Sequence, residues 1–356
     1  MSTETPMKIP RAGLIFTVVT LAFLLLYVGT NSFRSSSGSF SSSSFTSIFP
    51  SYFNYSTPPV QDSTLELEEI LKNASTVNKT VILTTLNDAW ASPGSIVDLF
   101  LKSFKLGDGT YKLLDHLVIV AMDQRAYTRC RIVHKHCYAL VTNGVDFHQE
   151  AYFMTPHYLK MMWRRIDFLR TVLELGYSFV FTDADIMWFR DPFPRFFPDA
   201  DFQIACDSFL GRSDDMNNRP NGGFNYVKSN NRTIAFYKFW YSSREKYPEN
   251  HDQDVLNMIK FDPFISDIGL KIRFLDTAYF GGLCEPSRDL NVVCTMHVNC
   301  CIGMDRKLID LRIMLQDWRA FMSLPPDLKN QSIISWRVPR NCSLKSVHHA
   351  DSPGKD

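Results

Sequence analysis

The sequence has almost no net charge, because 38 Lys and Arg residues are balanced by 37 Asp and Glu residues in a chain of 356. Binding to nucleic acid through counterion release needs a strongly basic face, so this balance argues against a nucleic-acid partner. Cysteine is scarce, at 8 residues, which excludes a small disulfide-rich scaffold. The absence of C-x-x-C and H-x-x-x-H spacings argues against a zinc site. With 45% hydrophobic residues, the chain is expected to fold rather than to be disordered throughout.

Charge is lacking altogether between residues 12 and 30, which consist mainly of Leu, Val, Phe and Ile. As a helix, such a stretch is long enough to cross about 30 Å of hydrocarbon. Lys8 and Arg11 precede it, so the positive-inside rule places residues 1–11 in the cytosol and the rest of the chain on the lumenal side. A cleaved signal peptide is the alternative, but its apolar core would be shorter. We therefore expect a single-pass type II membrane protein.

Residues 31–64 are rich in serine and nearly free of charge, which is typical of a flexible lumenal stem. Residues 65–356 are then expected to form the folded domain, and about 290 residues favour one domain over two. Six N-x-Ser/Thr sequons beyond the predicted anchor fit exposure in the secretory pathway: Asn54, Asn73, Asn78, Asn231, Asn330 and Asn341. These features indicate the Golgi apparatus or the endoplasmic reticulum, and we expect the Golgi membrane.

The cysteines agree with an oxidising lumen. Cys130 and Cys137, Cys284 and Cys294, and the adjacent Cys300-Cys301 can form disulfides there.

Short apolar runs alternate with amphipathic stretches along the expected domain. The runs that predict strands are 81–86, 117–122, 138–142, 178–181, 202–205 and 224–227. Helical spacing of apolar residues is found at 95–104, 159–175, 255–259 and 308–321. This alternation predicts an α/β fold with a mostly parallel sheet covered by helices. Ligands in such folds bind at the carboxyl ends of the strands.

Asp183 and Asp185 stand directly after the apolar run 178–181, at one of these carboxyl ends. Two carboxylates one residue apart offer hard oxygen ligands to a divalent cation and leave positions open for phosphate oxygens. A cation there would neutralise the charge of a leaving diphosphate, which is the chemistry of a nucleotide-sugar transferase. An isolated Asp-x-Asp is more often a solvated turn or a helix cap. The apolar residues before and after this one favour the cation site.

Four stretches carry a resemblance to a known family. They are FTDADIMWFRDPF at 181–193, NGGFN at 221–225, HDQDVLN at 251–257 and MHVNCC at 296–301. Together they resemble the plant nucleotide-diphospho-sugar transferases of glycosyltransferase family 77, which include cell-wall xylosyltransferases and arabinosyltransferases. The resemblance covers roughly residues 65–325. It implies a GT-A catalytic domain with a Rossmann-like sheet, a UDP-sugar donor, a divalent cation such as Mn²⁺ and retention at the anomeric carbon.

The resemblance further implies that Asp252, Gln253 and Asp254 flank the sugar and the acceptor, a cell-wall polysaccharide or a glycoprotein glycan. Gln253 would lie near the anomeric carbon, and Asp254 would hold sugar hydroxyls. Groups of this kind can stabilise an oxocarbenium-like transition state. Asp252 could instead be the N-cap of the helix predicted at 255–259.

His297 is the best candidate for a third metal ligand beside Asp183 and Asp185, because imidazole suits Mn²⁺-like sites and GT-A enzymes often supply a histidine late in the chain. A structural histidine is the alternative. Lys307 could hold the diphosphate, or it could be a surface charge at the start of a helix. The remaining residues expected to bind the donor are Thr84, Thr85, Asn87, Arg165, Asn221 and Gly222. Asn221-Gly222-Gly223 could instead form a tight turn before a strand.

Two other functions fit parts of the pattern. A haloacid-dehalogenase-type phosphatase also has an apolar strand followed by Asp-x-Asp, but its motif stands at the start of the domain rather than mid-chain. A catalytically inactive lumenal glycan-binding protein could share the fold. The Asp-x-Asp, the Asp252–Asp254 stretch and His297 favour the enzyme.

Overall fold

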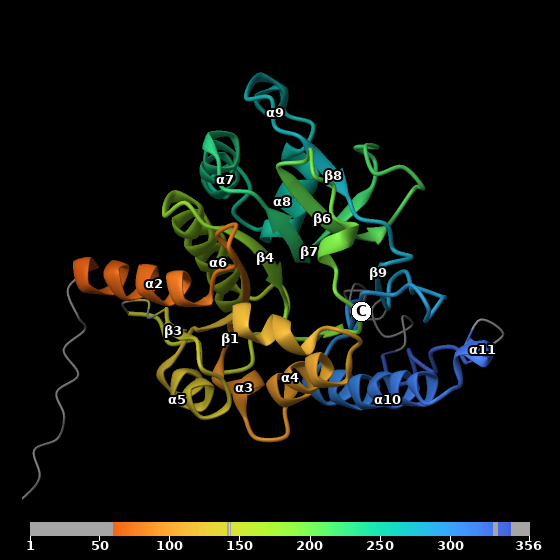
Figure 1. Cartoon of the computed structure of the whole chain (residues 1–356). Helices are drawn as coiled ribbons and strands as arrows, with labels where there is room; N and C mark the ends of the chain where they lie inside the picture. Colours follow the sequence, from red (N-terminus) through yellow and green to blue (C-terminus); the bar gives the residue numbers. More distant parts are fainter. Residues whose placement is uncertain (1–59, 141, 143, 330–333, 343–356) are drawn as a thin grey trace, which may run out of the picture. The chain divides into compact units, whose positions relative to one another are not determined.

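The computed structural model describes residues 60–140, 142, 144–329 and 334–342 (Figure 1). The predicted tail and anchor and most of the predicted stem lie outside these residues. Helix α2 (Val60–Ala74) shows that the expected boundary between residues 64 and 65 is wrong, since it falls inside a helix. Leu67 and Leu71, four residues apart and both buried, tie this helix to the domain despite its polar beginning. Among the described residues, no helix is long and apolar enough to cross a membrane.

A seven-stranded sheet with the order β3-β2-β1-β4-β7-β6-β8 forms the centre of the fold. Neighbouring strands are parallel except at β7, which runs antiparallel to both β4 and β6. The strands are β1 (Thr80–Leu86), β2 (Leu117–Ala121), β3 (Cys137–Ala139), β4 (Ser178–Thr182), β6 (Phe202–Ser208), β7 (Arg219–Val227) and β8 (Ile272–Phe274). The predicted α/β fold with a mostly parallel sheet is confirmed.

Helices cover both faces of this sheet, because successive side chains of the central strands point to opposite faces and both sets are apolar. In β1, Ile82 faces the core formed with α4 and α10, whereas Val81 and Leu83 face the core formed with α2, α6, α7 and α8. The helices are α3 (Asp88–Ala91), α4 (Ile96–Leu106), α5 (Gln124–Val133), α6 (Pro156–Glu174), α7 (Asn231–Ser243), α8 (Asp252–Ile259), α9 (Pro263–Asp267), α10 (Met304–Met322) and α11 (Pro326–Lys329). Two 3₁₀ helices, η1 (Tyr111–His116) and η2 (Phe193–Arg195), complete the set.

The antiparallel strand β7 corrects the expectation for Asn221-Gly222-Gly223, which lie within the strand and not in a turn before it. Because β7 runs against β4, its first half lies beside the carboxyl end of β4, where Thr182 is paired with Phe224. The backbone N–H of Asp183 donates to the carbonyl oxygen of Gly223 at 2.7 Å. The topology thus brings the Asn-Gly-Gly stretch to the first carboxylate of the Asp-x-Asp.

A smaller sheet brings a later part of the chain next to the residues that directly follow the Asp-x-Asp. It consists of β5 (Ile186–Trp188), β10 (Thr295–His297) and β9 (Phe280–Gly282), in that order. Strand β10 is antiparallel to β5, and His297 is paired with Ile186. The residue after Asp185 and the last residue of β10 are therefore neighbours across a strand pair.

Three disulfides join cysteines of the described residues: Cys130–Cys137, Cys284–Cys300 and Cys301–Cys342. The first agrees with the sequence analysis, whereas the pairing of Cys284 with Cys294 is wrong. Strands β9 and β10 are parallel, so the residues that follow each of them leave at the same end and meet. Cys294 precedes β10 at the other end and stays a buried thiol, and burial raises its pKa to about 11.

Replacing Cys342 by serine is expected to lower the free energy of unfolding by about 3–4 kcal/mol, because its disulfide closes a loop between residues 41 apart. Cys130→Ser is the matched comparison. It opens a loop between residues only 7 apart, which is expected to cost about 2 kcal/mol. Urea denaturation of both variants measures the two losses. A loss in Cys130→Ser that equals or exceeds the loss in Cys342→Ser would contradict the loop-length argument.

Candidate functional site

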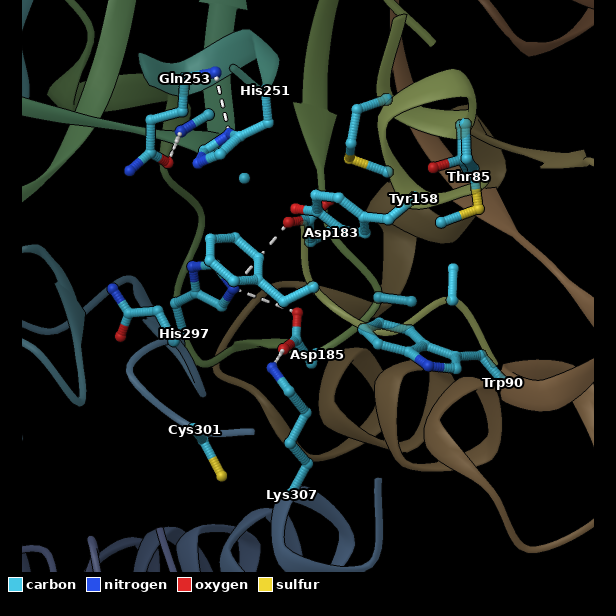
Figure 2. Close-up of a pocket in the computed structure, with 18 of the residues that line it drawn as sticks. Thr85, Trp90, Tyr158, Asp183, Asp185, His251, Gln253, His297, Cys301 and Lys307 are labelled. Atoms are coloured by element: carbon cyan, nitrogen blue, oxygen red, sulfur yellow. Dashed lines mark hydrogen bonds and ion pairs between the residues drawn. The ribbon is translucent and has the colours of Figure 1, made fainter. Parts of the chain in front are cut away.

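A cavity of about 390 Å³ opens at the carboxyl ends of β1 and β4. Its walls come from the end of β1, the Asp-x-Asp after β4, the first half of β7, the start of α8 and the segment from His297 to Lys307 (Figure 2). This is the position at which the parallel strands of an α/β sheet bind ligands, and the volume is usual for a small-molecule site.

The side chains of Asp183, Asp185 and His297 converge on one wall of the cavity, with ligand atoms within 4.8 Å of one another. His297 Nε2 lies 3.1 Å from Asp185 Oδ1 and 3.9 Å from Asp183 Oδ2 (Figure 2). Asp185 is only 1% exposed, whereas Asp183 and His297 are reached from the cavity. Two carboxylates and one imidazole form a donor set that suits a divalent cation such as Mn²⁺.

Asp185 provides a further observation that fits a cation. Within the described residues its buried Oδ1 accepts no hydrogen bond of acceptable geometry, although His297 Nε2 faces it. A cation between the two atoms would satisfy both lone pairs. Burial alone would raise the pKa of Asp185, but Lys307 and His297 outweigh burial and hold that pKa below its usual range. Burial raises the pKa of Asp183, although Arg165 opposes this effect.

Lys307 belongs to the first turns of α10 and reaches the same carboxylate. Its Nζ lies 2.6 Å from Asp185 Oδ2 and donates to the carbonyl oxygen of Val298 at 2.8 Å. It lines the cavity and is thus not the exposed surface charge that was the alternative. The ammonium group of Lys307 at this position is suited to binding phosphate oxygens.

Arg165 projects from α6 and connects two carboxylates. Its Nη1 lies 3.0 Å from Asp183 Oδ1, and its Nη2 lies 2.5 Å from Asp252 Oδ2. The guanidinium also stands over the Phe181 ring, 4.8 Å from the centroid. Burial would raise the pKa of Asp252, but Arg165 and His251 outweigh it and lower that pKa to about 2. Arg165 lines the cavity, but both Nη atoms are engaged with protein carboxylates.

The Asp252-Gln253-Asp254 stretch begins α8, and its three side chains point in different directions. His251 is the N-cap, with its Nδ1 accepting the backbone N–H of Gln253, so the N-cap reading of Asp252 is wrong. Asp252 and Gln253 line the cavity, whereas Asp254 does not, and its side chain is 41% exposed beside His251 Nε2. Two residues along a helix are about 200° apart, so Asp252 and Asp254 face opposite sides.

The residues expected to hold the base and ribose differ in whether they line the cavity and in whether their side chains are already hydrogen-bonded. Thr85 lines the cavity, but Thr84 alternates to the other side of β1 and is fully buried. Asn87 lines the cavity, but its Nδ2 donates to the carbonyl oxygens of Phe147 and Gln149 at 3.2 and 2.9 Å. Its Oδ1 accepts the N–H of Trp90 as the N-cap of α3. Asn87 thus ties the loop that contains residues 147–149 to the end of β1.

Asp207, near the end of β6, lines the cavity and was missed by the sequence analysis. It accepts hydrogen bonds from the amides of Asn221 and Gln253. A signal for it was present, because Asp207 stands two residues after the apolar run 202–205, just as Asp183 stands two residues after the run 178–181.

A model of the nucleotide-diphospho-sugar transferase family matches residues 112–311 of the chain. The chain belongs to this family. It is a glycosyltransferase, and the phosphatase alternative is wrong. An uncharacterized protein of Arabidopsis thaliana is 53% identical over 283 residues, which are 79% of this chain and 75% of that protein. The UDP-D-xylose:L-fucose alpha-1,3-D-xylosyltransferase 3 of the same plant is 23% identical over 326 residues, or 84% of this chain and 81% of that enzyme.

Among solved structures, the apo form of mouse xyloside xylosyltransferase 1 covers 62% of this glycosyltransferase and 98% of its own chain. The sequence identity is 15% and the TM-score is 0.40.

In this glycosyltransferase, replacing Gly223 by alanine is expected to lower donor turnover by about a hundredfold, because displacing a site by about 1 Å can cost that much. A Cβ there would lie 2.6 Å from His297 Cε1 and 2.7 Å from Asp183 Oδ2, so both side chains must move. Gly222→Ala is the matched variant, since its Cβ would meet no atom closer than 3.5 Å and its loss should be smaller. Hydrolysis of a nucleotide-sugar donor by the two variants measures both losses, and equal activities would refute the crowding argument.

Proposed function

We propose that the chain is a divalent-cation-dependent, retaining glycosyltransferase of the GT-A type within family 77. Its donor is a UDP-sugar that carries a pentose, such as xylose or arabinose, or galactose, and its acceptor is a cell-wall polysaccharide or a glycoprotein glycan. The observation that carries the proposal is the convergence of Asp183, Asp185 and His297 on one wall of the cavity that Gln253 also lines. The Arabidopsis thaliana xylosyltransferase supports a pentose, since its name describes transfer from UDP-D-xylose.

In the proposed reaction the bond between the anomeric carbon and the diphosphate oxygen breaks, and a bond to an acceptor hydroxyl oxygen forms. The hydroxyl proton leaves with the diphosphate. Asp183, Asp185 and His297 would hold the cation, which when bound neutralises charge on the diphosphate. Lys307 lies beside Asp185 and would donate to phosphate oxygens. The Gln253 amide would lie near the anomeric carbon, where positive charge develops.

The proposal extends to a type II protein of the Golgi membrane. Its support comes from the apolar residues 12–30, which lie outside the described residues, and from the sequons. Four sequon asparagines within the described part of the chain are exposed, as glycosylation requires: Asn73, Asn78, Asn231 and Asn341. Protease protection of the full chain in microsomes, together with endoglycosidase digestion, tests both points. Digestion of the domain by protease in intact microsomes would refute the lumenal orientation.

Hydrolysis of a panel of UDP-sugars in the presence of Mn²⁺ tests the function, and an acceptor array with the active donor follows. We expect turnover of one pentose or galactose donor that stops when a chelator removes the cation and returns when Mn²⁺ is restored. Turnover that continues in the chelator would refute cation dependence. No turnover of any donor would refute the enzymatic proposal and leave the inactive glycan-binding protein.

A further inference from the structure

Asp207 gathers the amide side chains that line the cavity, and the function proposed above gives it no part. Its Oδ1 accepts hydrogen bonds from Asn221 Nδ2 and Asn299 Nδ2, both at 2.8 Å. Its Oδ2 accepts one from Gln253 Nε2 at 2.9 Å. All four residues line the cavity, and they come from β6, β7, α8 and the segment after β10. One carboxylate therefore connects four separate parts of the chain at the site.

The contacts fix the orientation of the Gln253 amide at both ends. Its Oε1 accepts the backbone N–H of Gly222 at 2.9 Å, and a backbone N–H can only donate. Its Nε2 faces the carboxylate of Asp207, which when ionised can only accept. Turning the amide by 180° would place two donors face to face at Gly222 and two acceptors face to face at Asp207. Such a mismatch costs two hydrogen bonds in a partly buried site, so one orientation is favoured.

The two asparagine amides are held in the same sense. The Oδ1 of Asn221 accepts the backbone N–H of Gly223 at 2.9 Å, and the Oδ1 of Asn299 accepts that of Cys284 at 3.2 Å. In each amide the oxygen is thus occupied by a backbone donor and the nitrogen by Asp207. Each amide nitrogen thus retains a second N–H that can donate to a ligand.

We propose that Asp207 is a positioning residue that holds the Gln253 amide so that its second N–H is available to a ligand in the cavity. The inference rests on the proposed function, in which Gln253 lies beside the transferred sugar. An N–H donor does not stabilise positive charge at the anomeric carbon, but it suits the neighbouring oxygen of the bond that breaks, where negative charge develops. A preorganised donor contributes most where charge changes during the reaction.

Asp207→Asn tests the proposal because the new amide cannot satisfy every partner. Its oxygen can still accept from Asn221 and Asn299, but its NH₂ group then faces Gln253 Nε2. Gln253 must lose that hydrogen bond, or turn over and lose the one from Gly222. We expect kcat for UDP-sugar hydrolysis to fall by about a hundredfold with KM nearly unchanged. Asp214→Asn, an exposed carboxylate in the loop after β6, is the matched control and should keep its activity.

The double variant Asp207→Asn with Gln253→Glu separates a positioning role from a purely structural one. The carboxylate at position 253 can accept both from Gly222 and from the new amide, so Tm should recover toward the wild-type value. The N–H offered to the sugar is absent, so kcat should stay low. If the role of Asp207 did not involve Gln253, the second replacement would not restore Tm.

Two results would overturn the inference. One is a kcat of Asp207→Asn within about twofold of Asp214→Asn in an otherwise active enzyme. The other is a double variant that is no more heat-stable than Asp207→Asn, which would show that Asp207 does not hold Gln253. A wild-type protein without UDP-sugar turnover would instead refute the proposed function, and the Tm comparison would still decide whether Asp207 holds the amide.

Discussion

Asp185→Ala is expected to lower donor turnover by about a thousandfold or more, because a ligand of the proposed cation and the charge that organises the site are lost together. Asp185 is 1% exposed and lies within 3.1 Å of His297 Nε2 and 2.6 Å of Lys307 Nζ. The alanine leaves a single carboxylate, Asp183, and one imidazole for the cation. It also leaves Lys307 without its anionic partner.

The fold is expected to survive this change, since Lys307 keeps its hydrogen bond to the carbonyl oxygen of Val298. Steady-state hydrolysis of the active UDP-sugar over a wide range of Mn²⁺ concentrations measures the loss, and circular dichroism checks the fold. Asp115→Ala is the control, because that carboxylate is 68% exposed and pairs with Lys135 at the surface. A folded Asp185→Ala protein that retains more than about a tenth of wild-type turnover at saturating Mn²⁺ would rule out the metal role.

The sheet could be predicted from the sequence where strands are buried on both faces. In the run at 81–86, every residue that enters either core is apolar. The sequence therefore indicates both the length of this strand and its burial on both faces. Strand β7 could be predicted only from residue 224 onward, because Arg219 to Gly223 are polar, proline or glycine residues. Arg219 and Pro220 belong to the strand because β6 pairs with them, and Gly223 accepts the backbone N–H of Asp183. Local propensity does not encode these contacts.

The site shows the same division between local and long-range information. Asp183 and Asp185 could be found because a strand end leads directly to them. His297 needed the family resemblance, since its approach to Asp185 depends on the pairing of β10 with β5. The resemblance assigned Asp254 to the sugar hydroxyls, whereas α8 turns its side chain away from the cavity that Asp252 and Gln253 line. The resemblance identified the segments well, but it could not supply the direction of each side chain.

Arg165→Met is expected to cost about 3–5 kcal/mol of the free energy of unfolding, the largest loss of stability that we predict. The arginine side chain is 5% exposed and pairs with Asp183 and with Asp252, whose side chain is 2% exposed. A methionine of similar length fills the space but leaves both carboxylates without the guanidinium. An uncompensated buried charge costs more than the ion pair contributes, so the penalty comes chiefly from Asp252.

The double variant Arg165→Met with Asp252→Asn tests this cause directly. Removing the most buried of the stranded charges should restore a large part of the loss, even though the double variant contains fewer ion pairs than Arg165→Met. Arg125→Met is the control, because Arg125 is 74% exposed and its pair with Asp88 should contribute less than about 1 kcal/mol.

Urea denaturation of the wild type and the three variants compares their free energies of unfolding. If Arg165→Met were as stable as Arg125→Met, or if the double variant were less stable than Arg165→Met, the stranded charge of Asp252 would not be the source of the loss. The expected order instead makes Arg165 the group that compensates the charges of two carboxylates beside the cavity, Asp183 and Asp252.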